Sequence, residues 1–432
     1  MTATVTTPER VLVGVRGEDE SSMDLDRHLA AHGPLVAPDG DARWGAWVHR
    51  AVAESGLLGR GGAGFPSAGK WEAGRMASRR PVLVVNALEG EPASAKDRVL
   101  LLRCPHLVLD GAEAVAAAVR ASEILLCVPD HSWAVAASLE AALTERRRAG
   151  LSGRRVAVRR PPGRYVTGEE SALTDWLGGG PGRPMMRMDK SVPLRMARRA
   201  ALVHNVETLA HVALIARRGP EWFRQLGTPD APGSTLVTVT GAGSGPVVLE
   251  VELGTPVSQI LRWGRFEDPP SAVLLGGYGG TWLEGSRLDT PYAPAPLASV
   301  GATMGVGVVV GLPATSCGIA ETARIARYLA GESAGQCGPC VFGLPAIAGD
   351  LELLSSGRPD PSALERVAGR TSAVDGRGAC RHPDGLTRLV RSALRVFAAD
   401  ASSHALGRPC SGHISPTVLP LPPGSDPRGD AS

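Results

Sequence analysis

The chain has 432 residues, about three times the length of a typical domain, so several domains are expected. Hydrophobic residues make up 43% and charged residues 21%, and 46 basic against 43 acidic residues leave a net charge of +3. This balance excludes a disordered or collagen-like chain and argues against nucleic acid or an anionic membrane as the main partner.

Neither a membrane span nor a secretory signal is expected. The longest apolar runs, such as residues 306–312, fall short of the roughly 18 residues that a transmembrane helix needs. Residues 1–10 contain no apolar segment of the kind found in signal peptides. The seven cysteines are an odd number and unevenly placed, which argues for a reducing compartment. We therefore expect a cytoplasmic protein.

The first half of the chain alternates between strand and helix patterns. Short, fully apolar runs are typical of strands buried in a parallel sheet, and amphipathic segments lie between them. The alternation predicts a parallel α/β domain over residues 56–225, preceded by an N-terminal lead-in over residues 1–55. The expected strands are 81–85, 123–128 and 155–159, and the expected helices are 44–56, 107–119 and 132–148.

The second half changes in character. Short strands around one helix predict a small β-grasp module over residues 233–300. Helical periodicity then returns and predicts a helical bundle over residues 315–400, followed by a disordered tail over residues 401–432. The expected strands are 234–241, 247–251 and 272–275, with a helix over 256–263, and the bundle helices are 319–329, 344–354, 361–367 and 385–397.

A glycine-rich segment follows the first expected helix. Gly64 to Lys70 has the spacing of a Walker A loop, but Trp71 stands where Ser or Thr would bind magnesium, so a triphosphatase is not expected. The glycines would still let the backbone approach a phosphate or a flat ring, and Arg60 and Lys70 would supply positive charge. The alternative is a structural turn in a glycine-rich protein.

Three further motifs carry polar residues at ends of elements. Asn86, Glu89 and Glu91 follow an apolar strand, where α/β folds bind ligands, although the segment could also be an ordinary solvated loop. Glu169 and Glu170 would lie in the first turn of a helix, which the helix dipole favours by itself. Asn205 could equally be a simple N-cap.

Together, these motifs resemble a known family. The segments GRGGAGFP…K, NA-E-EP…KDR, GRYVTGEESAL and NVETLA occur in the order and spacing of the NADH-binding flavoprotein subunit of respiratory complex I. Related diaphorase subunits of formate dehydrogenases and bidirectional hydrogenases share them. The resemblance extends from about Gly56 to Phe397 and includes the β-grasp module and a C-terminal segment with a Cys-x-x-Cys pair.

The resemblance implies an NADH dehydrogenase-like oxidoreductase. FMN would lie in the α/β crevice, accept hydride from NADH, and release single electrons to a [4Fe–4S] cluster and then to a ferredoxin-like or other redox subunit, which could lie peripheral to a membrane complex. Carried over by motif, Glu91 and Glu170 would be catalytic. The cofactor-binding residues would be Arg60, Gly61, Gly62, Gly64, Lys70, Asn86, Glu89, Gly168 and Asn205 for FMN, and Phe65, Tyr165 and Glu169 on the nucleotide side, together with Glu91 and Glu170.

The same resemblance assigns Cys337, Cys340 and Cys380 to iron. The family's first cluster cysteine is replaced by Ala334, whereas such a cluster normally takes four thiolates. His382 is a local candidate for the fourth ligand, and Cys317 is expected to be a buried small residue instead. A zinc site made by the three cysteines and His382 is the chemical alternative.

Other positions also depart from the family pattern. Leu88 replaces an Asp, His204 replaces the first Asn of a pair, and the aromatic residues that sandwich NADH are absent at Ala73 and within Met185–Met196. These departures leave two alternatives open. One is a degenerate, non-catalytic homologue that serves as a scaffold or binding subunit, and the other is a different substrate acting on the same flavin.

Overall fold

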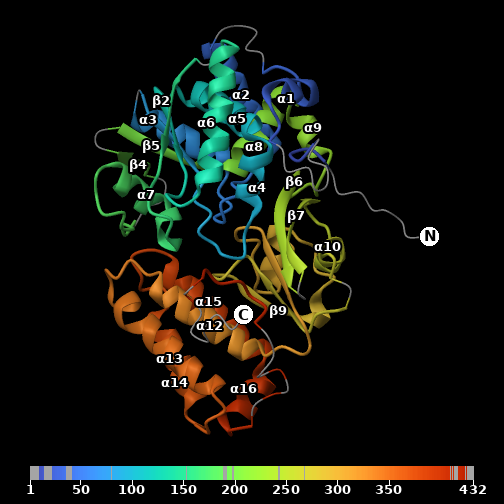
Figure 1. Cartoon of the computed structure of the whole chain (residues 1–432), viewed down its shortest axis with the longest axis vertical. Coiled ribbons are helices and arrows are strands. Elements are labelled where there is room, and N and C mark those ends of the chain that lie inside the picture. The colour runs from blue at the N-terminus through green and yellow to red at the C-terminus, as the bar shows by residue number, and fades with distance from the viewer. Residues whose placement is uncertain are drawn as a thin grey trace, which may run out of the picture.

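The computed structural model describes residues 9–13, 22–35, 41–78, 80–151, 153–187, 192–196, 199–241, 244–266, 268–408, 410, 412, 417–423 and 425. An α/β region lies at the top of Figure 1, a second sheet lies below it, and a group of helices forms the lower end of the molecule. The expected regions therefore follow one another in space as they do along the chain.

The first sheet has five strands in the order β3-β2-β1-β5-β4. All neighbours are parallel except β4, which runs antiparallel to β5. The three predicted strands are confirmed, whereas β4 and β5 were not predicted. The strand bounds are β1 Val82–Asn86, β2 Glu123–Cys127, β3 Arg155–Arg159, β4 Leu194–Met196 and β5 Arg199–Asn205.

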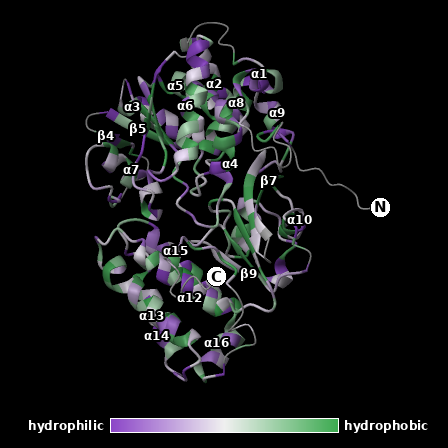
Figure 2. Ribbon diagram, viewed as in Figure 1, coloured by the Kyte–Doolittle hydropathy of each residue, from purple (hydrophilic) through white to green (hydrophobic). Residues whose placement is uncertain are grey.

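Both faces of this sheet are covered, which explains why its strands are apolar throughout. Leu83 and Val85 point to one face and pack against a large helical layer, while Val82 and Val84 point to the other, beside α7. Figure 2 shows the hydrophobic colouring of α5 and α8 within the helical layer. The helices of this region are α1 Leu25–His32, α2 Asp41–Ser55, α3 Ser67–Ala77, α4 Lys96–Arg103, α5 Pro105–Val119, α6 Trp133–Arg148, α7 Glu170–Leu177, α8 Val206–Arg218 and α9 Pro220–Arg224.

The described parts of the expected N-terminal lead-in belong to the same core. Val11, Met23, Trp44 and Val48 are buried in the cluster that also contains α5 and α8. The boundary expected near residue 55 therefore does not separate two packing units, because the apolar face of α2 is buried against these helices.

The second sheet has the order β7-β6-β10-β8-β9, with β6 and β10 parallel and the other neighbours antiparallel. Helix α10 packs on it through Val257, Ile260 and Leu261. The sheet extends beyond the expected boundary at residue 300, because β10 is one of its central strands. The elements are β6 Ser234–Gly241, β7 Ser244–Glu252, α10 Val257–Trp263, β8 Ala272–Leu275, β9 Thr281–Glu284, α11 Pro294–Ser299 and β10 Val308–Leu312.

The C-terminal region is helical, as predicted, and a π-helical turn over Pro339–Gly343 carries Cys340. The expectation of a disordered tail from residue 401 is wrong for two described parts: α16 continues to Ala405, and Leu419 is buried. Residues 409, 411, 413–416, 424 and 426–432 lie outside the described ones. The helices are α12 Gly318–Gly331, α13 Leu344–Ser355, α14 Ala363–Val374, α15 His382–Val396 and α16 Ala398–Ala405.

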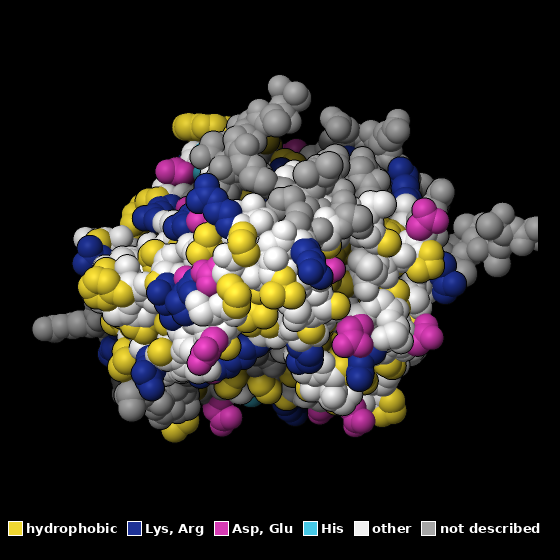
Figure 3. Space-filling view, turned by 90° about the horizontal axis from the view of Figure 1, so that it is seen from below, with side chains coloured by type: hydrophobic (Ala, Val, Ile, Leu, Met, Phe, Trp, Pro, Cys, Tyr) yellow, Lys and Arg dark blue, Asp and Glu magenta, His cyan; other side chains and the backbone are white. Residues whose placement is uncertain are grey.

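The surface carries both signs of charge. On the face shown in Figure 3, basic and acidic side chains are interspersed among apolar ones, in keeping with the small net charge. Among the residues that the structure describes, no helix combines the length and apolar character that crossing a bilayer requires.

The close packing of α5 on α8 gives a first prediction. A Cβ added at Gly111 would lie 1.9 Å from the Leu209 carbonyl oxygen, so Gly111→Ala must push the two helices apart. We expect a loss of about 1–3 kcal/mol, read as a lower thermal unfolding midpoint. The matched control is Gly369→Ala in α14, where a Cβ meets nothing within 4 Å and the midpoint should stay or rise. Equal midpoints for the two variants would contradict this packing.

Candidate functional site

The predicted motifs meet at one edge of the first sheet. From β1 the chain proceeds to β2 and β3 on one side, whereas β5 pairs with β1 on the other, so the strand order reverses between β1 and β5. Ligands of open α/β sheets bind in the crevice at such a switch point. Asn86 and Asn205, the last residues of the two strands, are register partners there.

The glycine loop lies directly over this edge. A Cβ at Gly61 would lie 3.2 Å from the Asn205 Cβ, so the loop backbone touches the end of β5. Gly62 and Gly64 have φ values of +100° and +60°, which other residues rarely adopt. A Cβ at Gly64 would meet nothing within 4 Å, so this part of the loop offers open backbone to a ligand.

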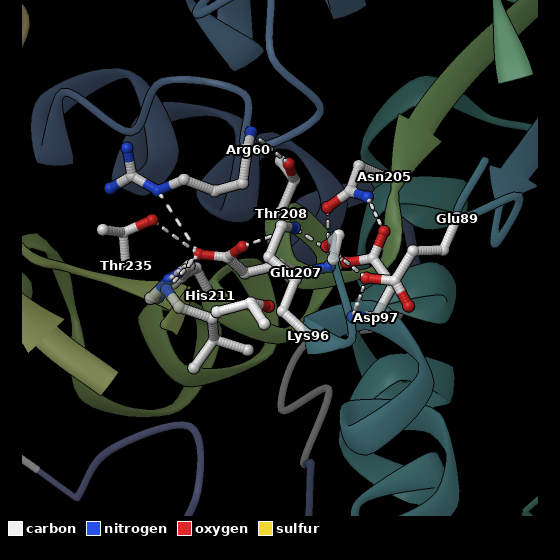
Figure 4. Close-up of polar contacts among 12 residues, drawn as sticks. Arg60, Glu89, Lys96, Asp97, Asn205, Glu207, Thr208, His211 and Thr235 are labelled. Carbon is white, nitrogen blue, oxygen red and sulfur yellow. Dashed lines mark hydrogen bonds and ion pairs between the residues drawn. The ribbon is translucent and has the colours of Figure 1, made fainter. Parts of the chain in front are cut away.

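A buried ion cluster supports the loop from below (Figure 4). The Lys96 ammonium lies 2.8 Å from carboxylate oxygens of both Asp97 and Glu207, and the Arg60 Nε lies 3.8 Å from Glu207. Burial alone would raise the pKa of Glu207. The pKa instead lies well below its ordinary value because of the charge of Lys96, the hydrogen bond with His211 and the charge of Arg60. The cluster therefore remains ionised and ties α4, α8 and the loop together.

Arg60 of this cluster was predicted to bind the cofactor, whereas Lys96, Asp97 and Glu207 were not predicted as site residues, although they lie inside the KDR and NVET motifs. Thr235 of β6 also donates to Glu207, at 2.9 Å, which brings the second sheet into the same network. The Arg60 backbone N–H donates to Thr208 at 2.9 Å, and its guanidinium donates to the Ser234 carbonyl. Arg60 is thus buried and positions the loop, and its charge does not face a ligand as was expected.

Glu89 and Asn205 are occupied by contacts within the protein. The Glu89 carboxylate accepts from the backbone N–H groups of Asp97 and Arg98, both at 3.0 Å, at the start of α4. Asn205 caps α8 by accepting from the Glu207 N–H, and its amide donates to Asp97 at 2.6 Å. Both residues therefore fix the starts of helices beside the crevice, as Figure 4 shows.

Lys70, Asn86, Gly168, Glu169 and Glu170 lie on the other side of the same edge. The Asn86 amide donates to the Gly168 carbonyl at 2.9 Å, and Glu169 caps α7 by accepting from two backbone N–H groups. Lys70 pairs with Glu170 and donates to the Val203 carbonyl, and both charged groups are partly exposed. The structure thus brings the four motifs together, with Lys70 as an accessible cation.

Two departures from the family pattern have structural explanations. Leu88 is buried in the apolar cluster under the sheet, with Leu125 and Leu173, so a core contact replaces the polar one. The indole N–H of Trp71 donates to His204 Nε2 at 2.8 Å, which fastens α3 to β5. Because Nε2 accepts, the neutral imidazole carries its proton on Nδ1. Burial and the Lys70 charge hold the His204 pKa well below its ordinary value.

Glu91 and Tyr165 lie where the α/β region, the second sheet and the helices meet. The Glu91 carboxylate accepts from the Tyr278 backbone N–H at 2.8 Å and from the Tyr165 hydroxyl at 3.3 Å. Burial raises the pKa of Glu91 to about 7, against the effect of these hydrogen bonds. Glu91 is therefore able to hold or release a proton near neutral pH. The Tyr165 backbone N–H donates to Glu332, just before the predicted cluster segment.

The three predicted iron ligands lie close to one another and to the crevice. Burial and the neighbouring thiols of Cys337 and Cys380 raise the pKa of Cys340 to about 12. Burial also raises the pKa of Cys380, and a backbone hydrogen bond partly offsets this increase. The negative charge of Glu169 raises the pKa of Cys380 further. Glu169 caps α7 at the edge of the crevice, and its charge acts on the Cys380 thiol. Direct contacts between the two regions include those of Tyr165, whose N–H donates to Glu332 and whose ring packs against His382, two residues after Cys380.

His382 is not placed as the fourth ligand was expected to be. Its Nε2 lies 2.7 Å from the Leu329 carbonyl oxygen, and its ring packs against Tyr165. Among the described residues, the group of three or more donor atoms within 4.8 Å of one another is a different one, Cys317, His404 and Cys410. Cys337, Cys340 and Cys380, all described, do not form such a group within 4.8 Å, which suits a cluster, whose thiolates bind different irons, better than a single zinc ion.

Comparison with known proteins agrees with this geometry. Residues 52–214 match the Nuo51 FMN-binding domain, and residues 320–404 match the NADH-ubiquinone oxidoreductase-F iron-sulfur binding region. The F subunit of the NADH-quinone oxidoreductase of Streptomyces coelicolor is 30% identical over 426 residues, which cover 93% of each chain. The chain belongs to the NADH-quinone oxidoreductase F family.

Another member of this family and a solved structure extend the likeness. The corresponding F subunit of Mycobacterium bovis is 30% identical over 83% of this chain and 84% of its own length. The H2-reduced NAD+-reducing [NiFe]-hydrogenase has a chain of similar structure, with a TM-score of 0.77 and 32% identity over 84% of this chain. This chain spans 63% of that hydrogenase chain.

The residues present fit the FMN of the NADH-quinone oxidoreductase F family. Gly64 leaves open space beside the loop backbone, where a ligand could come close, whereas Gly61 and Gly62 let the loop pack against Asn205 and Val306. Lys70 offers an accessible ammonium to a phosphate. For the iron–sulfur cluster, three thiols fit and the fourth position does not, because Ala334 carries no donor atom.

The raised pKa of Glu91 predicts a pH dependence. The pKa of Glu91 is about 7 in the folded protein and 4.5 at its ordinary value, so between these pH values the folded protein binds the proton and the unfolded chain does not. The contribution of this proton to the free energy of unfolding is therefore complete below pH 4.5 and is lost as the pH rises to about 7. Glu91→Gln should lack this decline in thermal unfolding midpoint. Glu365→Gln, which changes an exposed carboxylate on α14, is the control and should keep the decline in unfolding midpoint. Parallel curves for wild type and Glu91→Gln would contradict the assignment.

Proposed function

We propose that this chain oxidises NADH through FMN and passes the electrons singly to an iron–sulfur cluster in its helical region. The observation that carries the proposal is the contact between the two regions: Tyr165, from the motif beside the β1–β5 switch point, donates its N–H to Glu332, five residues before Cys337, and packs its ring against His382, two residues after Cys380. Flavin accepts two electrons as hydride and releases them one at a time, which a cluster requires.

The chain's own residues would hold FMN by shape and charge. The backbone of Gly61, Gly62 and Gly64 would face the ligand, and Lys70 would neutralise the phosphate. Four further residues would contribute to FMN binding by fixing the segments around the crevice and by offering their remaining hydrogen-bond acceptors to the ligand: Asn86, Glu89, Gly168 and Asn205. Arg60 would hold the loop in place from inside the protein.

The nucleotide would enter on the side of Phe65, Tyr165, Glu169 and Glu170. Phe65 is 48% exposed, so its ring face is available for stacking on a base or ring. Glu170 lies at the surface beside Lys70 and could position the nicotinamide nucleotide once Lys70 turns to a phosphate. Glu91, buried with a pKa of about 7, would take up or release the proton that accompanies two-electron transfer.

Three units would divide this work. Residues 56–225 would bind FMN and NADH, residues 315–400 would carry the cluster, and residues 233–300, extended by β10, would form a β-grasp module between them. The helix-bearing five-stranded sheet with parallel β6 and β10 supports the last assignment. The electron acceptor would be a ferredoxin-like or other redox subunit, in the cytoplasm or at the periphery of a membrane redox complex.

The described part of the fold favours this function over a non-catalytic scaffold. The residues that shape the crevice are packed and hydrogen bonded, and the thiols of the three matched cysteines lie together. Flavin binding and iron content separate the two alternatives, since a scaffold needs neither flavin nor iron.

The Lys70 cation predicts the behaviour of a flavin-binding variant. A hydrogen bond to a charged group contributes about 1.5–3 kcal/mol, so Lys70→Ala should raise the FMN dissociation constant by about 10- to 100-fold. Fluorescence titration of the full chain with FMN measures this. Arg75→Ala, which removes an exposed charge from the same helix, is the control and should bind like wild type. Wild-type protein that takes up no FMN would overturn the proposal.

Ala334 predicts a labile cluster that a single change can strengthen. Ala334 and Glu332 line a cavity of about 280 Å3 between α7 and the segment before Cys337, so a cysteine fits there without displacing the core. Ala334→Cys should raise the iron and sulfide content of protein prepared without oxygen and slow the loss of iron in air. Ala334→Ser, of similar size, is the control. Absence of iron from both wild type and Ala334→Cys would contradict the cluster.

A further inference from the structure

A second group of metal-ligating side chains lies in the helical region, apart from the three cysteines assigned to iron. Cys317 precedes α12, His404 lies on α16, and Cys410 lies in the segment that follows α16. Their donor atoms lie within 4.8 Å of one another. Cys317 and His404 are 2% and 0% exposed, and Cys410 is partly exposed. Three segments of the chain thus bring two thiols and an imidazole to one point.

One distance in this group is close to that of a metal site, and the others lie within 4.8 Å. Cys317 Sγ lies 3.8 Å from His404 Nε2. In a tetrahedral zinc site, with Zn–S of about 2.3 Å and Zn–N of about 2.0–2.1 Å, ligand atoms lie about 3.5–3.8 Å apart. The Cys410 backbone N–H donates to the same Nε2 at 3.1 Å, so this nitrogen carries no proton. A bound ion would take the lone pair that this hydrogen bond now uses.

The start of α12 adds a favourable field. Cys317 is the N-cap of this 14-residue helix, and its sulfur accepts from the Ala320 N–H at 3.4 Å. The positive end of a helix dipole favours a thiolate, which is the form that binds metal, and so acts against the burial that raises the pKa of Cys317 to about 12. Two thiolates and a neutral imidazole are a donor set that prefers zinc to magnesium or calcium.

We propose that Cys317, His404 and Cys410 bind one zinc ion, with the fourth position open to water. Its role would be structural, because Leu419, nine residues after Cys410, is hydrogen bonded to α12. The Leu419 backbone N–H donates to Glu321 at 3.1 Å, and the Leu419 carbonyl accepts from Arg324. Glu321 and Arg324 form a buried ion pair at 2.7 Å, so the ion would fasten the segment that shields this pair from water.

This inference does not depend on flavin or on the iron–sulfur cluster. Its test must nevertheless keep zinc out of the cluster thiols, which could also bind it. The full-length chain with Cys337, Cys340 and Cys380 all changed to Ser provides that background. Purified without oxygen or chelator, it should contain about one zinc per chain by mass spectrometry of its metal content.

Adding Cys410→Ser to that background should abolish the zinc and lower the thermal unfolding midpoint. Cys104→Ser is the matched control, since Cys104 is a buried cysteine outside the group, and it should keep the zinc. Should Cys410→Ser fail to fold, cobalt titration of the background protein decides instead, because thiolate ligation gives intense charge-transfer absorption. Absence of both zinc uptake and that absorption, or a Cys317–Cys410 disulfide in the anaerobic protein, would overturn the proposal.

Discussion

The buried ion pair between Lys96 and Glu207 is the interaction on which the crevice depends. It joins the helix after β1 to the helix after β5, the two strands between which the ligand-binding crevice opens. Removing one partner of a buried pair leaves an uncompensated charge, typically at a cost of about 3–5 kcal/mol. The glycine loop rests on this pair through Arg60, so the open backbone above it is held in place before any ligand arrives.

The same cluster connects the crevice to the rest of the molecule. Thr235 joins the cluster to the second sheet by its hydrogen bond to Glu207. Glu91, outside the cluster, accepts from the Tyr278 backbone N–H and so makes a second contact between the α/β region and the residues that follow β8. A carboxylate with a pKa of about 7 at this junction is suited to a reaction that moves two electrons and a proton. The contacts of Tyr165 with Glu332 and His382 join the crevice to the two segments that carry the cysteines, which agrees with the matched FMN and iron–sulfur regions.

Much of the fold was predictable because the core strands are uniformly apolar and the helices between them amphipathic. The bounds of β3, β6 and β8 agree with the prediction residue for residue. β5 was missed because His204 interrupts its apolar run, and its partner Trp71 is far away in sequence. β10 was seen only as an apolar run, since its pairing with β6 crosses about 70 residues and leaves no local signal.

The site was predictable to the level of motifs, and less so to the level of roles. Glu89 and Asn205 were placed correctly at the crevice, yet their capping of α4 and α8 depends on contacts that only the fold creates. Cys317 was expected to be a buried small residue, and it is buried. Its approach to His404 and Cys410 could not be predicted, because it depends on how α16 and the segment after it pack against α12.

Anaerobic titration of the FMN-loaded chain with NADH, followed by optical and electron paramagnetic resonance spectra, tests the central claim most directly. The account predicts that the flavin absorbance bleaches and that a reduced-cluster signal then appears, because the crevice and the cysteine group adjoin. Bound FMN that NADH leaves oxidised would contradict it.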